Sequence, residues 1–189
     1  GEGGNHFIHT IRRNVDIAHF VHDNQIYGLT KGQGSPTTAK GQKTTLQFDG
    51  VKLEPVKPVA LSLTMGAGFV ARGFSGDIPH LVKLMKEAIT YKGYAHLDIF
   101  QPCVVWNKVN TFKWYKEHTY YLPDDYDYTN YDEAYKKALE WDDGIPLGIL
   151  YKVEKETYED SFDFIKNGPP LVDATLDPMD AVRLWIIQY

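Results

Sequence analysis

The residues best suited to chemistry stand in two short stretches near the start of the chain. The first, Gly1-Glu2-Gly3-Gly4, precedes a predicted helix that begins at Asn5. Glycines at this place let backbone N–H groups approach an anion, and a helix N-terminus favours negative charge. An ordinary turn before a helix has the same composition and is the more common interpretation. Taken alone, this stretch is compatible with both.

The second stretch is Asp23-Asn24-Gln25-Ile26-Tyr27-Gly28, which follows a predicted strand. Ligands of open α/β sheets bind beyond the carboxyl ends of strands. The side-chain oxygen of Asn24 and the backbone oxygen of Ile26 are hard donors, of the kind that Mg²⁺ accepts together with water and phosphate oxygens. An Asx turn that closes the strand explains the same residues equally well.

The elements that must position these stretches follow an alternating pattern. Helix periodicity is found over residues 5–13, 79–91 and 131–141, and strand patterns over residues 17–21, 68–74, 94–100 and 145–153. The apolar run 17–21 indicates a buried parallel strand. Residues 28–50 form a long loop without periodicity, which is typical of a functional or disordered segment. Alternation at this spacing predicts a mainly parallel α/β sheet.

The predicted helix over residues 79–91 has the clearest apolar face. Asp77 supplies the capping signal, and Pro79 lies in the first turn. We expect the buried face to consist of Leu81, Leu84, Met85, Ala88 and Ile89.

The composition excludes several classes of protein. The chain has 189 residues, 43% hydrophobic and 24% charged, which are ordinary values for a globular domain, so we expect one domain over residues 1–189. A net charge of −5 with scattered basic residues argues against a nucleic-acid partner. No apolar run approaches the roughly 18 residues of a membrane helix. A single cysteine, Cys103, precludes an internal disulfide and fits a reducing compartment, so we expect a cytoplasmic protein.

One further set of motifs is specific: GGNHFIH at 3–9, DNQIYGLTKGQ at 23–33, SPTT at 35–38, FVARGFSG at 69–76, QPCV at 101–104, Asn107, Asn110-Thr111 and the segment 140–148. Together they resemble the β subunit of 2-oxoacid:ferredoxin oxidoreductases, which are thiamine-diphosphate enzymes. The resemblance covers residues 1 to about 150, and the remainder only loosely. It implies a three-layer α/β fold of the thiamine-diphosphate-binding type, truncated at the N-terminus.

The resemblance also implies the ligands of the cofactor. Asn24 and Ile26 match the closing Mg²⁺ ligands of the family motif, and Gly3, Gly4 and Asn5 match its diphosphate-binding part. The opening Gly-Asp-Gly of the family would lie just upstream of Gly1. We therefore interpret the chain, which has no initiating Met, as a fragment cut within its cofactor motif. As such it should bind the metal and the diphosphate poorly or not at all.

Residues that follow the metal ligands are implied to lie near the thiazolium ring and the substrate. We expect cofactor contacts from four of them: Gly28, Leu29, Thr30 and Gln33. Lys31 is implied to be catalytic, because its amine can pair with a 2-oxoacid carboxylate. The alternative is a solvated loop lysine.

Cys103 is implied to supply one thiolate to a [4Fe–4S] cluster, whose other three ligands would lie outside this chain. Since a cluster normally needs four cysteines, we expect a free thiol in the fragment. The alternative is a buried, inert thiol. The histidine pairs His6/His9 and His19/His22 lack a matching second pair or a nearby cysteine, so packing or hydrogen bonding is expected of them instead of zinc.

The implied reaction is oxidative decarboxylation of a 2-oxoacid, with CoA as acyl acceptor and ferredoxin as electron acceptor. The glutamate that activates the cofactor is implied to come from a partner α subunit. Pyruvate, 2-oxoglutarate and branched-chain acids remain open as substrates. Three rival hypotheses stay: a non-oxidative thiamine-diphosphate decarboxylase or carboligase, a catalytically silent structural piece, and a generic nucleotide-binding domain, against which the missing Gly-x-Gly-x-x-Gly argues.

Overall fold

A computed structural model describes residues 2–141, 144–170 and 172–173 of the chain. The contacts divide the chain into two units, residues 1–158 and 159–189, which are described separately. The prediction of a single domain over the whole chain therefore stays a prediction. The tail 177–189, for which the sequence predicts no element, lies outside the described residues.

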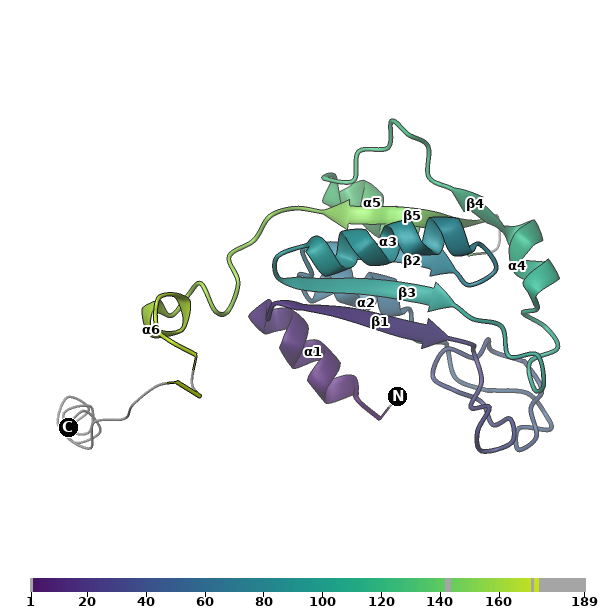
Figure 1. Cartoon of the computed structure of the whole chain (residues 1–189). Coiled ribbons are helices and arrows are strands. Elements are labelled where there is room, and N and C mark those ends of the chain that lie inside the picture. Colours follow the sequence, from purple (N-terminus) through teal and green to yellow (C-terminus); the bar gives the residue numbers. More distant parts are fainter. Residues whose placement is uncertain (1, 142–143, 171, 174–189) are drawn as a thin grey trace. The chain divides into compact units, whose positions relative to one another are not determined.

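The first unit alternates helices and strands along the chain, as Figure 1 shows. Its elements are α1 (Gly4–Arg13), β1 (Ile17–Asp23), α2 (Pro58–Thr64), β2 (Phe69–Phe74), α3 (Ile78–Thr90), β3 (Tyr94–Phe100), α4 (Phe112–His118), β4 (Thr119–Tyr121), α5 (Tyr131–Leu139) and β5 (Ile145–Lys152). In the second unit, the described residues contain the short helix α6 (Asp163–Lys166), and Lys166 forms an ion pair with Asp160 at 3.6 Å.

The strands form one sheet in the order β1-β3-β2-β5-β4. β1, β3 and β2 run parallel, so their carboxyl ends meet at one edge of the sheet. β5 is antiparallel to β2, and β4 is parallel to β5. The predicted mainly parallel sheet is confirmed. Its carboxyl edge is the one from which the loop 24–57 and the loop 101–111 leave.

Helices cover both faces of this sheet, which confirms the predicted three layers. α3 packs against β2 and β3 on one face, where Leu84, Leu97 and Phe69 are buried together. α1, α2 and α5 cover the other face, around Leu63, Val70 and their buried neighbours. In Figure 1, α3 lies in front of the sheet and α2 behind it. β3 lies between two strands, and all seven of its residues are buried.

The capping prediction for α3 is confirmed by geometry. The Asp77 carboxylate accepts a hydrogen bond from the backbone N–H of His80 at 3.2 Å, and proline occupies the first turn. Leu81, Leu84 and Ala88 are buried as predicted. Ile89, however, is 63% exposed, so it does not belong to the buried face.

Three further predictions need correction or addition. β1 is a parallel strand, but it is not buried: among the described strands it pairs only with β3, and most of its residues are partly or fully exposed. α2 was not predicted because its seven residues are nearly all apolar and show no helical period. α4 and β4 are short and rich in aromatic residues, so neither has a readable pattern.

No helix within the described residues combines the length and apolar character that crossing a bilayer requires.

Candidate functional site

A cleft of about 940 Å³ lies at the carboxyl edge of the sheet, between the start of α1 and the loop that follows β1. It brings together the two stretches singled out in the sequence. Its lining includes Gly3, Gly4, Asn24, Ile26, Gly28, Leu29 and Thr30. Four predicted site residues do not line it: Asn5, Lys31, Gln33 and Cys103.

Gly3 and Gly4, at the start of α1, present bare backbone to this cleft. The helix begins at Gly4 with Gly3 as its N-cap, one residue before the start predicted at Asn5. No side chain caps the helix, and its first turn contains no acidic residue. A Cβ added at Gly3 or Gly4 would meet nothing within 4 Å. Uncapped N–H groups at an open helix N-terminus are suited to phosphate oxygens.

The turn after β1 carries the two predicted oxygen donors, the side-chain oxygen of Asn24 and the backbone oxygen of Ile26. Asn24 Oδ1 accepts a hydrogen bond from the N–H of Ile26 at 3.0 Å, which is the Asx turn considered as an alternative. An amide oxygen has a second lone pair, so this turn leaves Asn24 able to bind a cation as well. Within the described residues, no hydrogen bond occupies the carbonyl oxygen of Ile26. The turn and the metal interpretation are thus compatible.

Hydrogen bonds from the loop fix this turn on the strand. Asp23 Oδ1 accepts from the N–H of Gln25 at 3.0 Å and from the hydroxyl of Thr37 at 2.6 Å. The hydroxyl of Thr38 donates to the carbonyl of Gln25 at 2.6 Å. Gln25 adopts a left-handed backbone with φ of 55°, which is uncommon for a residue with a side chain. Burial raises the pKa of Asp23, against the opposing effect of these hydrogen bonds.

Two buried ionisable side chains lie beneath this edge, and neither was predicted from the sequence to have a role. Arg72 on β2 and Asp98 on β3 are 3% and 1% exposed, with Nε and Oδ2 separated by 3.7 Å. Burial, together with the nearby charge of Asp23, raises the pKa of Asp98 to about 7, although Arg72 opposes the shift. Asp98 Oδ1 and Arg72 Nη1 have no hydrogen-bond partner. The signal in the sequence that could have revealed them was an ionisable residue within a largely apolar strand.

Lys31 lies near the tip of a tight loop that a backbone bridge closes. The N–H of Tyr27 donates to the carbonyl of Gln33 at 2.9 Å, and the N–H of Gly32 donates to the carbonyl of Tyr27 at 2.9 Å. The Gln33 side chain accepts a hydrogen bond from Thr30 within the same loop. Leu29 is 99% exposed. The loop therefore carries Lys31 at the surface beside the cleft.

Cys103 stands at the carboxyl end of the neighbouring strand, half-buried and next to this loop. A Cβ added at Gly28 would lie 3.4 Å from the Cys103 sulfur. Burial raises the pKa of the thiol, but the backbone N–H groups of Trp106, Val105 and Asn107 outweigh it and hold the pKa below its usual value. A ring of N–H donors suits a thiolate that ligates a metal.

Within the described residues, no group of three or more His, Cys, Asp or Glu side chains could hold a metal. Cys103 is therefore the one ligand that this part of the chain could supply to the predicted [4Fe–4S] cluster. His19 and His22 take hydrogen-bonding roles: His19 Nδ1 lies 2.5 Å from the hydroxyl of Tyr94, and His22 Nδ1 lies 2.6 Å from the Gln101 amide oxygen.

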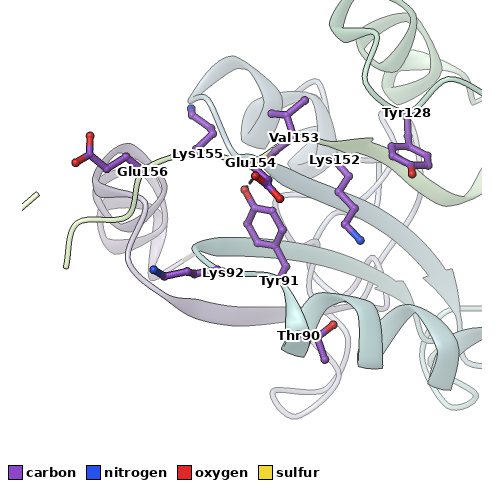
Figure 2. Close-up of a pocket in the computed structure, with 9 residues that line it drawn as sticks. All are labelled: Thr90, Tyr91, Lys92, Tyr128, Lys152, Val153, Glu154, Lys155 and Glu156. Atoms are coloured by element: carbon purple, nitrogen blue, oxygen red, sulfur yellow. Dashed lines mark hydrogen bonds between the residues drawn. The ribbon is translucent and has the colours of Figure 1, made fainter. Parts of the chain in front are cut away.

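A second cleft, of about 720 Å³, lies around the end of α3 and the end of β5 (Figure 2). Three of its polar side chains are bonded to groups of the fold. The Tyr91 hydroxyl donates to the carbonyl of Val153 at 2.7 Å, Lys152 pairs with Glu87 at 2.8 Å, and Lys155 donates to the carbonyl of Gly66 at 2.6 Å. Because these bonds link the end of α3 and the end of β5 to the rest of the fold, we assign this cleft a structural role.

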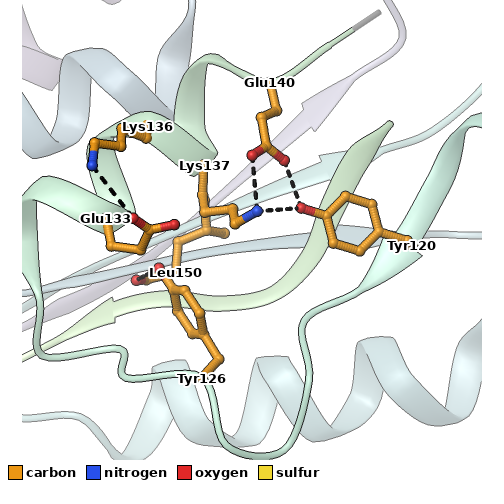
Figure 3. Close-up of polar contacts among 7 residues, drawn as sticks. All are labelled: Tyr120, Tyr126, Glu133, Lys136, Lys137, Glu140 and Leu150. Atoms are coloured by element: carbon orange, nitrogen blue, oxygen red, sulfur yellow. Dashed lines mark hydrogen bonds and ion pairs between the residues drawn. The ribbon is translucent and has the colours of Figure 1, made fainter. Parts of the chain in front are cut away.

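A third polar cluster ties α5 to β4 (Figure 3). Lys137 Nζ lies 2.8 Å from Glu140 Oε1 and 2.9 Å from the Tyr120 hydroxyl, which donates to Glu140 Oε2 at 2.5 Å. The Tyr126 hydroxyl donates to the carbonyl of Leu150 at 3.0 Å. Tyr120 and Tyr126 are thus anchored in the fold by their hydroxyl groups.

Comparison with known proteins identifies the family. Residues 2–99 match the thiamine pyrophosphate enzyme C-terminal TPP-binding domain, which includes every residue of the cleft. The chain belongs to the thiamine pyrophosphate enzymes. Residues 103–167 match a second description, the C-terminal part of the pyruvate ferredoxin oxidoreductase beta subunit.

Relatives within this family have similar names. The chain is 40% identical over 188 residues to a 2-oxoacid:ferredoxin oxidoreductase subunit beta of Sulfolobus sp, with 93% of this chain and 61% of the relative covered. It is 40% identical over 105 residues to the 2-oxoglutarate oxidoreductase subunit KorB of Mycobacterium tuberculosis, covering 56% of this chain and 28% of that subunit.

Among solved structures, a 2-oxoglutarate:ferredoxin oxidoreductase from Magnetococcus marinus, with 2-oxoglutarate, coenzyme A and succinyl-CoA bound, matches with a TM-score of 0.87 and 31% identity. The match covers 96% of this chain and 62% of that one. The resemblance stated from the sequence motifs is confirmed. This thiamine pyrophosphate family chain spans 61% of the length of the Sulfolobus relative.

Proposed function

We propose that this chain forms the thiamine-diphosphate-binding part of a 2-oxoacid:ferredoxin oxidoreductase β subunit, working with an α subunit. The observation that carries the proposal is the single cleft in which Gly3 and Gly4 meet Asn24 and Ile26. This arrangement pairs an anion-binding helix start with two oxygen donors. A diphosphate held through Mg²⁺ requires both.

The residues fit the cofactor in kind and in size. A cleft of about 940 Å³ is within the range for a ligand of this class. Backbone N–H groups at Gly3 and Gly4 would hold the diphosphate, and Asn24 Oδ1 and the Ile26 carbonyl would hold Mg²⁺. Gly28, Leu29 and Thr30 would form the adjoining wall. When bound, thiamine diphosphate supplies the nucleophilic carbon that attacks the keto group of a 2-oxoacid and accepts its electrons after CO₂ leaves.

Three further residues, Lys31, Gln33 and Cys103, have proposed roles outside the cleft lining. The ammonium group of Lys31, exposed beside the cleft, would pair with a carboxylate of the 2-oxoacid and orient it, and Gln33 would support the same loop. Cys103 would supply one ligand to a [4Fe–4S] cluster, through which electrons leave for ferredoxin. CoA would accept the acyl group. 2-Oxoglutarate is the first substrate to test, because two of the relatives carry its name.

The test is an assay of the natural protein that carries this chain, purified with its α subunit. We expect reduction of a viologen or of ferredoxin that depends on a 2-oxoacid, CoA, thiamine diphosphate and Mg²⁺ together. Omitting thiamine diphosphate should abolish the signal. No reduction with 2-oxoglutarate, pyruvate or a branched-chain 2-oxoacid would contradict the proposal.

The N–H donors around Cys103 favour this function over a non-oxidative decarboxylase or carboligase, which has no use for a metal-ligating thiolate. Iron analysis of the purified assembly separates the two. An iron-free complex that releases CO₂ and forms aldehyde or a carboligation product would support the non-oxidative alternative. An assembly that binds no thiamine diphosphate would support a silent structural role.

A further inference from the structure

The loop that carries Lys31 is held in a costly backbone conformation. Lys31 has φ of 73° and Gly32 has φ of 89°, so two consecutive residues are left-handed. Glycine adopts this conformation freely, but a residue with a side chain pays for it. Such a conformation persists only where the surroundings fix it, and it is concentrated at functional sites.

One side of this loop is fixed by Trp106, from the loop after β3. The indole lies flat against the loop backbone: a Cβ added at Gly32 would come within 3.0 Å of Trp106 Cε3 and 3.1 Å of Cδ2. The same ring lies 3.9 Å from the Cβ position of Gly28. The indole is therefore packed so closely against Gly32 that a side chain at position 32 would have to displace it.

The other side of the loop is fixed by Thr45. Its hydroxyl donates to the carbonyl of Lys31 at 2.9 Å, and its N–H donates to the carbonyl of Gly32 at 3.2 Å. Both carbonyls of the left-handed pair are thus bonded to Thr45, while the aromatic ring of Trp106 packs against Gly32. Because these two residues from other parts of the chain contact the turn, the position of the Lys31 backbone depends on them.

We propose that Trp106 is a positioning residue: it acts through the Gly32 backbone to aim Lys31 at the substrate carboxylate. Thr45 serves the same purpose from the other side. This inference rests on the proposed function, in which Lys31 binds the 2-oxoacid. Trp106 itself touches neither the cofactor nor the substrate in this account. Its side chain also differs in role from its backbone N–H, which faces Cys103.

A double-mutant cycle on the natural αβ assembly tests the proposal. We expect Trp106→Leu to lower kcat/KM for the 2-oxoacid about tenfold or more, mainly through KM, and to cost less than about twofold when Lys31→Met is already present. Trp106→Phe, which keeps a ring over Gly32, should restore most of the loss. Val109→Ala, a change of an exposed residue in the same loop, should leave kcat/KM unchanged.

Equal costs of Trp106→Leu in both backgrounds would overturn the proposal, because an effect that is independent of Lys31 is a general structural one. Should Trp106→Leu fail to fold, Thr45→Val replaces it in the same cycle, since it removes the hydroxyl bond to Lys31 and keeps the shape. Absence of any 2-oxoacid-dependent reduction by the unaltered assembly would instead overturn the proposed function, and this inference with it.

A second readout needs neither cofactor nor substrate. Trypsin cleaves after Lys31 only when the loop opens, so we expect Trp106→Leu to speed cleavage at that bond several-fold while cleavage after the exposed Lys43 keeps its rate. Unchanged cleavage after Lys31 would show that the indole does not hold the loop, and would overturn the proposal.

Discussion

The two clefts of the first unit differ in how their polar groups are satisfied. In the cleft beside α3 and β5, Lys152, Tyr91 and Lys155 are each bonded to a group of the fold, with N···O or O···O separations of 2.6 to 2.8 Å. At the carboxyl edge, the Ile26 carbonyl has no donor among the described residues, and buried atoms of Gln25 and Asp98 have no partner. The three side chains named in the first cleft are thus bonded within the fold, whereas the Ile26 carbonyl that lines the second accepts no hydrogen bond among the described residues.

The backbone shows the same contrast. Two of the three non-glycine residues with positive φ, Gln25 and Lys31, lie in the loop at the carboxyl edge, among the described residues. The third, Asn14, follows α1, and its side chain is bonded to the backbone of Tyr94 and Glu156. Two of the three left-handed non-glycine residues thus lie next to the cleft where the ligand is proposed to bind. Strain is retained where function requires it and is compensated by bonding elsewhere.

The largest effect is expected from Arg72, which lies between two buried carboxyl groups. Among the described residues, Arg72 is the cation that compensates Asp98 and Asp23, so we expect Arg72→Met to cost about 3–5 kcal/mol of stability. Urea unfolding followed by circular dichroism measures it. Asp98→Asn, which removes a charge and keeps the shape, should cost clearly less. Equal losses would show that the ion pair matters only as packing.

A smaller but specific effect is expected from Asn24. In the natural full-length protein, Asn24→Ala should weaken Mg²⁺-dependent binding of thiamine diphosphate by about 10- to 100-fold, or ~1.4 to 2.7 kcal/mol. Asn24→Asp keeps an oxygen at the same place and serves as the matched control. Calorimetric titration gives both affinities. If the Asn24→Ala variant binds thiamine diphosphate as tightly as the unaltered protein does, the side-chain oxygen of Asn24 only forms the turn and does not bind the metal.

The buried carboxyl of Asp98 should make stability depend on pH. Burial raises its pKa in the folded state to about 7, from an ordinary 3.8. Between pH 4 and pH 7 the folded chain therefore keeps a proton on Asp98 that the unfolded chain has already lost. Stability from this group is complete below pH 4 and declines as pH rises to 7, by at most about 1.4 kcal/mol per pH unit.

Asp98→Asn isolates this contribution, because asparagine does not titrate. The stability of the unaltered protein minus that of the variant should fall as pH rises from 4 to 7, and then level off. A difference that stays constant over this range would show that Asp98 is already ionised in the folded state.

The smallest effect is expected at the satisfied cleft. Lys152 and Glu87 form an ion pair whose side chains are 34% and 39% exposed, so Lys152→Met should change stability by no more than about 1 kcal/mol. It should leave the affinity for thiamine diphosphate unchanged. A loss of cofactor affinity in this variant would break the distinction between the two clefts.

The sequence was a good guide where local signals decide the structure. The strand Tyr94–Phe100 was predicted to the residue, because Gly93 precedes it and Pro102 follows shortly after. The sequence could not show that β1 is an edge strand, because edge or centre is a property of the assembled sheet. Ile89 follows the helical period of α3, yet it is 63% exposed, because the exposure of a helix face depends on which elements pack against it.

The candidate site divides in the same way. Asn24, Ile26 and the glycines were visible as motifs, and the pairing of β1 with β3 explains why the loops after those strands meet. The contact of Trp106 with Gly32 joins residues far apart in the sequence, so no local pattern could announce it. The pairing of Arg72 with Asp98 likewise depends on the register of β2 against β3.

The central claim is that the carboxyl-edge cleft binds thiamine diphosphate through Mg²⁺. Calorimetric titration of thiamine diphosphate into the natural β subunit that carries this chain, with and without Mg²⁺, tests it most directly. The account predicts saturable binding at one site per chain that disappears when the metal is chelated. Binding that is equally tight without a divalent cation, or no binding at all, would contradict it.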